Sequence, residues 1–407
     1  MKISWKQFSE AHELLSTVIA PTPLIYNEWL STQYECEVYL KLENMLPIGS
    51  FKMRGATNKI ARLSELERKQ GVLAVSAGNH AQGVAWAARK FKVDATIIMP
   101  EGSPLTKIRN TEKLGAKVIL HGASIEDGFK YAEELMKKKP MVFVHPYKDP
   151  LVIAGQGTVG FELADQLPDM DFVFSSIGGG GLVGGMGTVL KKLCPKVKLI
   201  AGQAAGCRAM VDSLKAKKVV KAKEATTFAD GIRVKVAHPE MLAILSKVVD
   251  ESYAVEDEKT AFAVLRLLER ARVLAEGAGA LPLALLNELF EKNPKRFKGK
   301  KIVIVVCGGN IDVNLLERII DRGLVEGHRK VRISVPIADR PGTLNALTGI
   351  IKETGANILQ VVHDRDSQGT GLTGANVLFT LETKGTHELS ELLSRMKEDF
   401  PLAQVLR

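Results

Sequence analysis

The sequence contains little cysteine, and its four cysteines show no metal-binding or disulfide pattern. Cys36, Cys194, Cys207 and Cys307 form neither a Cys-x-x-Cys pair nor a Cys/His cluster. Zinc sites and disulfide frameworks need such short, repeated spacings. We therefore predict no metal site and no disulfide scaffold, and we expect a reducing, cytoplasmic environment.

Long apolar runs are also missing. No segment approaches the roughly 20 apolar residues that a membrane-spanning helix requires. The first 20 residues contain charges and lack the apolar centre of a secretion signal. We therefore expect no membrane partner.

Aromatic residues make up only 6% of the chain, whereas the net charge is +10. A basic protein could bind nucleic acid. Here, however, basic residues mostly alternate with acidic ones, and the basic runs 137–139 and 215–223 lack interleaved aromatic residues for stacking on bases. We interpret the charge as a solvated, lysine-rich surface and expect no nucleic-acid partner.

Between residues 36 and 325, short apolar runs alternate with helical patterns. The predicted strands are Val38–Leu40, Gly71–Val75, Ala95–Met99, Lys117–Leu120, Met141–His145, Phe172–Ile177, Lys198–Gly202 and Lys301–Cys307. Predicted helices between them include Gln82–Lys90, Ile125–Lys138 and Thr260–Arg270. This alternation predicts an α/β domain with a mostly parallel sheet and with ligands at the carboxyl ends of the strands.

The pattern changes after the polar segment Asp321–Lys330. Beyond this segment we predict strands at 331–337, 357–364, 374–383 and 402–406, and helices at 341–354 and 387–399. The resulting βαββαβ order packs two helices on one face of an antiparallel sheet. A chain of 407 residues is long enough for two or three domains. We place the boundary at 325–330, between a domain of residues 1–325 and one of residues 330–407.

Four consecutive glycines, Gly178–Gly181, lie between a predicted strand and a helix predicted at 184–193. Backbone N–H groups of such a run can converge on one anion, and the helix N-terminus adds its dipole. We predict a phosphate-binding loop, although glycines needed only for a tight turn and close packing are an alternative. The loop lacks the Gly-x-x-x-x-Gly-Lys-Ser/Thr pattern of nucleoside triphosphatases.

Lys52 follows Ser50, a candidate helix N-cap, and precedes the helical segment Met53–Leu63. In a first helical turn the helix dipole disfavours the charged lysine and favours the neutral amine that forms a Schiff base. Taken alone, Lys52 would be one surface lysine among many.

Two further strand ends carry polar groups. Ser76-Ala77-Gly78-Asn79-His80 follows one predicted strand and offers donors for a carboxylate. Val306-Cys307-Gly308-Gly309-Asn310 closes another strand in the same way. His80 and Cys307, taken singly, would fit packing roles.

Together these motifs resemble those of the threonine/serine dehydratases. The matching segments lie in order within residues 5–325 and are Lys41–Asn44, Ser50–Ala56, Ser76–Gly83, His145–Tyr147, Ala154–Thr158, Gly178–Leu182, Ala229–Ile232, Glu276–Ala280 and Cys307–Asn310. The resemblance implies the tryptophan-synthase-β-like fold (fold type II), with a small subdomain at about residues 54–148. It also implies pyridoxal 5'-phosphate as the cofactor, a small amino acid as the substrate and a homo-oligomer, a dimer or tetramer.

The resemblance also implies a role for each matching residue. Lys52 would hold the cofactor as a Schiff base and move the Cα proton. The cofactor would further contact Phe51 (ring packing), Asn79 (phenolic oxygen), Cys307 (pyridine nitrogen) and, through its phosphate, Gly178, Gly179, Gly180, Gly181 and Leu182. The substrate carboxylate would bind Ser76, Ala77, Gly78, Asn79 and His80.

A neutral thiol such as Cys307 cannot keep the pyridine nitrogen protonated, so the ring would be a weaker electron sink than one facing an aspartate. β-Elimination needs carbanion character only briefly, and a weaker sink suffices. The implied activity is that of a threonine ammonia-lyase, converting L-threonine, and also L-serine, to 2-oxobutanoate or pyruvate and ammonia.

Some positions depart from the family pattern. Ala77 stands where serine racemases commonly have a proton-transferring serine, which favours the dehydratase. Ile48 replaces a usual threonine, and we assign no effect to it. Gln203 replaces a frequent glutamate near Cys207 and Ala209, where some relatives place metal contacts. Because a neutral amide is a poor ligand for a hard cation, we predict no metal there.

The C-terminal segment resembles an ACT domain. Its matching loop consists of Asp339, Arg340, Pro341, Gly342, Thr343 and Leu344, and Asn357 follows the next helix. Pro341 suits a first helical position, and Gly342 allows close backbone approach. ACT domains usually pair and bind small amino acids. We predict an isoleucine or valine effector at these residues that changes catalytic affinity; the alternative is a domain that only promotes assembly.

Two other functions remain open from the sequence. One is another reaction of fold type II, serine racemisation or β-replacement, against which Ala77 argues. The other is an inactive amino-acid sensor, against which Lys52, Asn79 and the glycine run argue.

Overall fold

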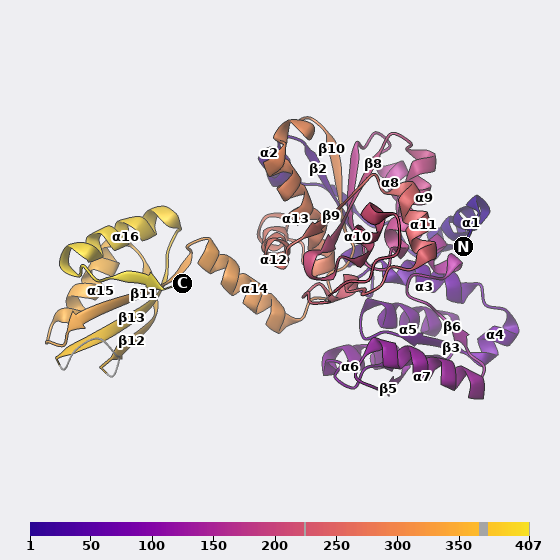
Figure 1. The fold of residues 1–407 in the computed structure, drawn as a ribbon, viewed down its shortest axis with the longest axis horizontal. Coiled ribbons are helices and arrows are strands. Elements are labelled where there is room, and N and C mark those ends of the chain that lie inside the picture. Colours follow the sequence, from indigo (N-terminus) through magenta and orange to yellow (C-terminus); the bar gives the residue numbers. More distant parts are fainter. Residues whose placement is uncertain (224, 366–372, 407) are drawn as a thin grey trace. The chain divides into compact units, whose positions relative to one another are not determined.

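The computed structural model describes residues 1–407 except 224, 366–372 and 407. It contains two compact units, residues 1–311 and 312–407 (Figure 1). The division lies one helix before the boundary predicted at 325–330, because α14 (Val313–Glu326) groups with the second unit. Residues 321–326 of the polar segment that suggested a linker form the C-terminal half of this helix, and only residues 327–329 connect it to the first strand of the second unit. No helix in the described part of the chain is long and apolar enough to cross a membrane.

A six-stranded sheet forms the centre of the first unit, in the order β1-β2-β10-β7-β8-β9. Its strands are β1 (Leu24–Tyr26), β2 (Glu37–Leu42), β7 (Phe172–Ser176), β8 (Lys198–Ala204), β9 (Glu251–Val255) and β10 (Lys301–Val306). Only β1 runs antiparallel to its neighbour. Strand β10 is apolar after its first residue, and β7 and β10 are buried almost throughout, as expected of parallel strands covered on both faces. The predicted parallel α/β architecture is confirmed.

Helices surround this sheet. They are α1 (Trp5–Ser16), α2 (Glu28–Tyr34), α8 (Pro150–Gln166), α9 (Gly181–Leu193), α10 (Ala209–Ala216), α11 (Pro239–Val248), α12 (Asp257–Arg266) and α13 (Gly277–Lys292). The helix predicted at Thr260–Arg270 ends earlier, because its last turn widens into a π-helical segment, Leu267–Ala271.

A second, smaller parallel sheet has the order β5-β4-β3-β6. Its strands are β3 (Val72–Val75), β4 (Ala95–Met99), β5 (Lys117–Leu120) and β6 (Val142–Phe143), and the surrounding helices are α3 (Lys52–Ala61), α4 (Glu65–Gln70), α5 (Asn79–Phe91), α6 (Leu105–Lys113) and α7 (Ile125–Lys138). Helix α7 has the predicted bounds because Ser124 and Asp127 form a capping box at its start.

The second unit contains an antiparallel sheet in the order β12-β13-β11-β14. Its elements are β11 (Lys330–Ala338), α15 (Thr343–Thr354), β12 (Asn357–Asp364), β13 (Gly374–Glu382), α16 (Thr386–Asp399) and β14 (Gln404–Leu406). Burial alternates along β13, so one face of the sheet packs on a core and the other does not. This is the predicted βαββαβ order and an ACT-like architecture.

The start of α15 differs from the prediction. The helix begins at Thr343, so Pro341 is not its first residue. Gly342 precedes it with φ +94°, a left-handed conformation that interrupts the helical path and favours glycine. A Cβ on Gly342 would meet no atom within 4 Å, so backbone conformation rather than close approach requires the glycine.

Candidate active site

The predicted glycine loop connects β7 to α9, which begins at Gly181. The backbone N–H groups of residues 178–182 donate to no acceptor among the described residues. A Cβ on Gly179 would lie 2.3 Å from the Tyr147 ring, and Gly180 has φ +92°. The loop therefore combines both interpretations of the sequence: its glycines are needed for packing and backbone conformation, and its N–H groups remain free for an anion.

Lys52 lies in the first turn of α3, as predicted, but it is the first residue of the helix, and the helix cap is Phe51 rather than Ser50. The Ser50 hydroxyl instead accepts a hydrogen bond from the Lys52 backbone N–H at 3.4 Å. The Lys52 Nζ donates to the carbonyl of Pro146 at 2.9 Å, and Tyr147, the next residue, packs against the glycine loop. This contact brings the lysine beside the loop.

Burial lowers the pKa of Lys52 to about 8, against the opposing effects of Cys307 and Glu276. We predicted a helix-dipole effect at this lysine, but loss of hydration is the largest cause. At pH 7 roughly a tenth of the amine is therefore neutral, far more than for an ordinary lysine. The neutral amine is the form that attacks a carbonyl.

The turn from β3 to α5 offers a second set of free donors. Helix α5 begins at Asn79, and the N–H groups of residues 77 and 79–81 have no acceptor among the described residues. The N–H of Gly78 donates to the Ser76 hydroxyl at 3.2 Å, which shapes the turn. The turn could hold a carboxylate at the helix N-terminus.

The ring of His80 points away from this turn. Its Nε2 lies 2.8 Å from the carbonyl of Val144, which can only accept, so Nε2 carries the proton. Burial, together with Lys52, lowers the pKa of His80 to about 3, and the imidazole is therefore neutral. The backbone N–H of His80 remains as a donor for a carboxylate, whereas the unprotonated Nδ1 is a buried acceptor without a partner among the described residues.

Cys307 follows β10 and is buried, with an exposed fraction of 2%. Burial raises the pKa of its thiol to about 12, so the side chain is a neutral thiol, 3.5 Å from the hydroxyl of Ser176. The Cys307 carbonyl accepts from the N–H of Phe51 at 3.0 Å. The segment before Lys52 is thereby joined to the end of β10.

Asn79 lies in a hydrogen-bonded chain that the sequence did not reveal. Its Nδ2 donates to the Glu276 carboxyl group at 2.8 and 3.1 Å, and its Oδ1 accepts from Asn310 at 2.8 Å. Glu276 occurs in a recognised motif, but no role was predicted for it. The two residues are 197 positions apart in the chain, so no local pattern predicts their contact. The one available signal was a charged residue at the start of the Glu-Gly-Ala-Gly-Ala motif.

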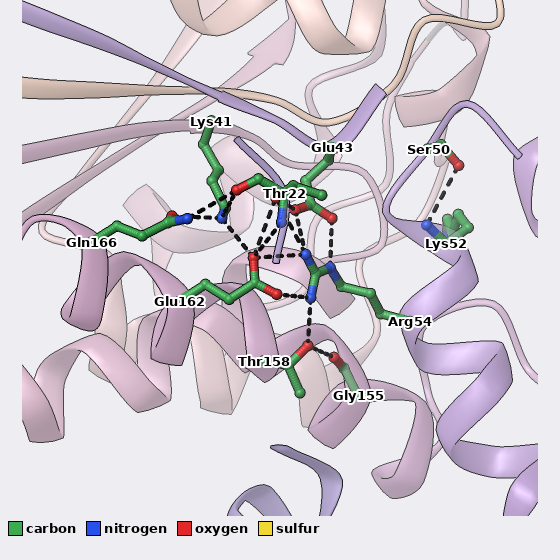
Figure 2. A network of polar contacts seen from close by, with 10 residues as sticks. All are labelled: Thr22, Lys41, Glu43, Ser50, Lys52, Arg54, Gly155, Thr158, Glu162 and Gln166. Atoms are coloured by element: carbon green, nitrogen blue, oxygen red, sulfur yellow. Dashed lines mark hydrogen bonds and ion pairs between the residues drawn. The ribbon is translucent and has the colours of Figure 1, made fainter. Parts of the chain in front are cut away.

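A buried ionic network lies beside Lys52 (Figure 2). The guanidinium of Arg54 contacts Glu43 at 2.6 Å and Glu162 at 2.5 Å, and Lys41 contacts Glu162 at 2.6 Å. Thr22 and Thr158 complete the network through their hydroxyls. Since α3, α8 and β2 each contribute a charged side chain, the network fixes the helix that begins with Lys52. Sequence reasoning missed it, although Lys41 and Glu43 flank the end of a buried strand.

Two positions that depart from the family pattern have structural roles. Ile48 is buried in a cluster with Leu46 and Met53, and its carbonyl accepts from Asn310 at 2.7 Å. The Gln203 Oε1 accepts from the N–H groups of Met210 and Val211, in the first turn of α10. The described residues contain no group of three or more His, Cys, Asp or Glu arranged to hold a metal.

The ACT-like unit does not bring all its predicted effector residues together within one chain. Asp339, at the end of β11, contacts Arg365 at 2.6 Å, just beyond the last residue of β12. Asn357 is the first residue of β12 and pairs with Glu382. The loop 339–344 and Asn357 therefore lie at opposite ends of β12, because α15 carries the chain back along the sheet.

Pyridoxal phosphate fits the residues of the first unit. The free N–H groups at residues 178–182 suit its phosphate, and the buried amine of Lys52 suits its aldehyde. Cys307, with its neutral thiol, is joined to the Lys52 segment by a backbone hydrogen bond. The amide of Asn79 is hydrogen-bonded to the segment that follows Cys307.

Comparisons with known proteins agree with this fit. The family model described as pyridoxal-phosphate dependent enzyme matches residues 15–308. The L-threonine ammonia-lyase of Thermotoga maritima is 46% identical over 391 residues, 96% of each chain. That of Geobacter sulfurreducens is 38% identical over 398 residues, 98% of each chain.

Solved structures also match. Threonine deaminase isoform 2 from Solanum lycopersicum has a TM-score of 0.74 and 33% identity, over 78% of this chain and 92% of that chain. Maize serine racemase has a TM-score of 0.74 and 29% identity, over 81% of this chain and 100% of that chain. The chain therefore belongs to the family of pyridoxal-phosphate-dependent enzymes, in the group that contains the threonine ammonia-lyases.

Proposed function

We propose that the protein deaminates L-threonine to 2-oxobutanoate and ammonia, and that it also converts L-serine to pyruvate. The observation that carries the proposal is the buried Lys52 amine, with a pKa lowered to about 8, beside free N–H groups at residues 178–182. The names of relatives that match nearly the whole chain support threonine as the substrate.

The bound cofactor supplies an electron sink for the electrons released when the Cα–H bond breaks. The N–H groups of residues 178–182 hold its phosphate, and those at the start of α5 hold the substrate carboxylate. These two contacts orient the Cα–H bond toward Lys52, whose amine accepts the proton. Ala77 has no hydroxyl and cannot donate a proton to Cα, which favours elimination over racemisation.

We further propose that residues 330–407 act as a regulatory domain for catalytic residues 1–325, and that isoleucine or valine is the effector. The exposed loop 339–344 supports a binding role. Its Asp339 carboxylate pairs with Arg365, and the α-amino group of an effector would compete for this carboxylate. Because Asn357 lies at the other end of β12, a binding site that includes it requires a second chain. We therefore propose a homo-oligomer, a dimer or tetramer. We also propose that the protein is cytoplasmic, which its four free cysteines support.

The activity is tested with the purified full-length protein. We expect visible absorbance that is lost in Lys52→Ala, and release of ammonia and 2-oxobutanoate from L-threonine. D-Serine formation without comparable ammonia would instead identify a racemase. A colourless protein that binds isoleucine would identify a sensor.

The regulatory proposal is tested by adding isoleucine or valine to the full chain and to Asp339→Asn. We expect the threonine dependence of the rate to shift in the first protein and to shift less in the second. Unchanged kinetics in both proteins would contradict an effector role.

A further inference from the structure

Glu276 immediately precedes α13, at the N-cap position, where Ser, Thr, Asp or Asn usually caps a helix with its side chain. It does not do so, since its side chain makes no capping hydrogen bond. Its carboxyl group instead accepts from Asn79 at both oxygens, at 2.8 and 3.1 Å, and is buried, with an exposed fraction of 5% for the residue. The Glu276 carboxyl group therefore bonds Asn79 and not the backbone of its own helix.

The amide of Asn79 is held at both ends. Asn310 donates to its Oδ1 and also to the carbonyl of Ile48, which leaves Asn310 no freedom to rotate its amide without losing a bond. Asn79 must therefore present its NH2 group toward Glu276. A single hydrogen on Nδ2 can serve both carboxyl oxygens, and the second hydrogen then remains for a ligand.

The packing around Glu276 is tight. Its backbone N–H donates to the carbonyl of Gly308, the residue after Cys307. A Cβ on Gly308 would lie 2.5 Å from the Glu276 Oε1, and one on Gly231 would lie 3.2 Å from it. Two glycines thus leave room for this carboxyl group, and they come from two of the motifs that surround Lys52.

No cation lies within ion-pair distance of Glu276 among the described residues. Burial, and then the nearby charge of Asp230, raises the pKa of Glu276 to about 7, while the hydrogen bond from Asn79 and the charges of Lys107 and Lys52 act in the opposite direction. Cys307, the remaining titratable neighbour, is a neutral thiol. The carboxyl group can therefore change charge close to neutral pH.

We propose that Glu276 is a positioning residue that aims Asn79 at the phenolic oxygen of the bound cofactor and, when ionised, stabilises the protonated nitrogen that joins Lys52 to the cofactor. This inference rests on the proposed attachment of the cofactor to Lys52. A negative charge beside the hydrogen-bond donor disfavours further negative charge on the phenolic oxygen and favours positive charge on the adjacent nitrogen.

The test is a pH titration of the visible absorbance of the cofactor-loaded, full-length protein. Glu276→Gln keeps an oxygen acceptor for Asn79 but removes the charge. We expect the protonated form to be lost at a pH about one unit lower than in the wild type. Glu288→Gln is the matched control, because it makes the same change on α13 at a partly buried carboxylate paired with Lys259 and Lys292. It should titrate as the wild type does.

A second variant covers the case in which Glu276→Gln does not fold. Glu276→Asp keeps the charge with a shorter side chain, so its titration should lie closer to the wild type than that of the glutamine variant. In an Asn79→Ala background, removal of the Glu276 charge should shift the titration less than in the wild type, because Asn79 no longer links the carboxyl group to the phenolic oxygen.

Three outcomes would overturn the inference: a wild-type titration in Glu276→Gln, equal shifts in Glu276→Gln and Glu288→Gln, or a shift in Glu276→Asp as large as in Glu276→Gln. These results are distinct from failure of the proposed function. If wild-type protein shows no visible absorbance, or if Lys52→Ala keeps it, the proposed attachment is wrong and the inference is overturned with it.

Discussion

The buried carboxyl groups near Lys52 have two different kinds of surroundings. Glu43 and Glu162 meet the guanidinium of Arg54 (Figure 2), whereas Glu276 meets the neutral amide of Asn79. Burial acts to raise the pKa of both Glu162 and Glu276. Arg54 and Lys41 overcome it and lower the pKa of Glu162, but nothing comparable offsets it at Glu276, whose pKa is about 7.

The same side chain in similar burial therefore has two uses. Where a cation contacts it, it is a permanent charge that holds α3, α8 and β2 together. Where only an amide contacts it, it can gain or lose a proton near neutral pH, and such groups are typical of functional sites. Arg54 is the main counter-ion, since the charges of Glu43 and Glu162 raise its pKa against the effect of burial, whereas burial lowers the pKa of Lys41.

The largest expected effect is that of Arg54→Met, which leaves two buried carboxylates without their main cation. We expect the free energy of unfolding to fall by about 3–5 kcal/mol, measured by urea denaturation. Arg62→Met, at the end of the same helix, removes a more exposed pair with Glu10 and should cost less than about 1 kcal/mol. Equal losses in the two variants would show that burial does not distinguish them.

The second effect is the pH dependence that Glu276 introduces. Its pKa is about 4.5 in the unfolded chain and about 7 in the folded protein. The folded state therefore holds more protons between these values, and the contribution of Glu276 to stability falls as pH rises through this window. The unfolding free energy of Glu276→Gln relative to wild type should rise by about 3 kcal/mol between about pH 4 and pH 8 in the cofactor-free protein. A constant difference would contradict the raised pKa.

The third effect is the pH dependence at Glu162, which has the opposite sign to that at Glu276. The folded-state pKa of Glu162 is lowered, so its contribution to stability is present above its unfolded pKa and is lost as pH falls through the folded value. Glu162→Gln should cost about 2 kcal/mol at neutral pH, and the difference from wild type should shrink in acid. Urea denaturation at several pH values measures both; a difference that grows in acid would refute this assignment.

The smallest effect is expected for Lys41→Met. Glu162 keeps Arg54, and the carbonyl of Thr22 keeps its hydrogen bond from Gln166. We expect a loss of about 1 kcal/mol, clearly below that of Arg54→Met, in the same denaturation experiment. A loss as large as that of Arg54→Met would mean that the two cations share the role equally.

Much of the fold followed from local patterns. The alternation of apolar strands and helices predicted the parallel sheets, and the C-terminal βαββαβ order was confirmed element by element. The strands β1 and β9 were missed. Strand β1 has three residues and exposed side chains, and β9 is only partly buried, so neither carries the apolar signal of a central strand.

The site residues also divide into those marked by local sequence and those that only the fold brings together. The glycine loop, Lys52 and the turn after β3 could be recognised because a glycine run, a helix start and a strand end are local features of the chain. The starts of α3 and α15 were each misplaced by one or two residues, because Phe51 and Gly342 take the cap positions. Helices α5 and α9 begin at Asn79 and Gly181, each three residues before the predicted start. From the sequence we placed the loop 339–344 and Asn357 in one effector site, but the direction of α15 separates them within one chain.

The family, the layered α/β architecture and the backbone donors around Lys52 could all be inferred from the amino-acid sequence, because each depends on short-range conformation and on the spacing of motifs. The tertiary structure alone decided the charge states. Burial lowers the pKa of Lys52. Glu276 is buried without a cation, and its pKa is raised. Glu162 contacts Arg54, from which it is separated by 108 positions in the chain. Desolvation and charge contacts arise only when segments far apart in the sequence come together, and they distinguish a structural carboxylate from one that can exchange a proton.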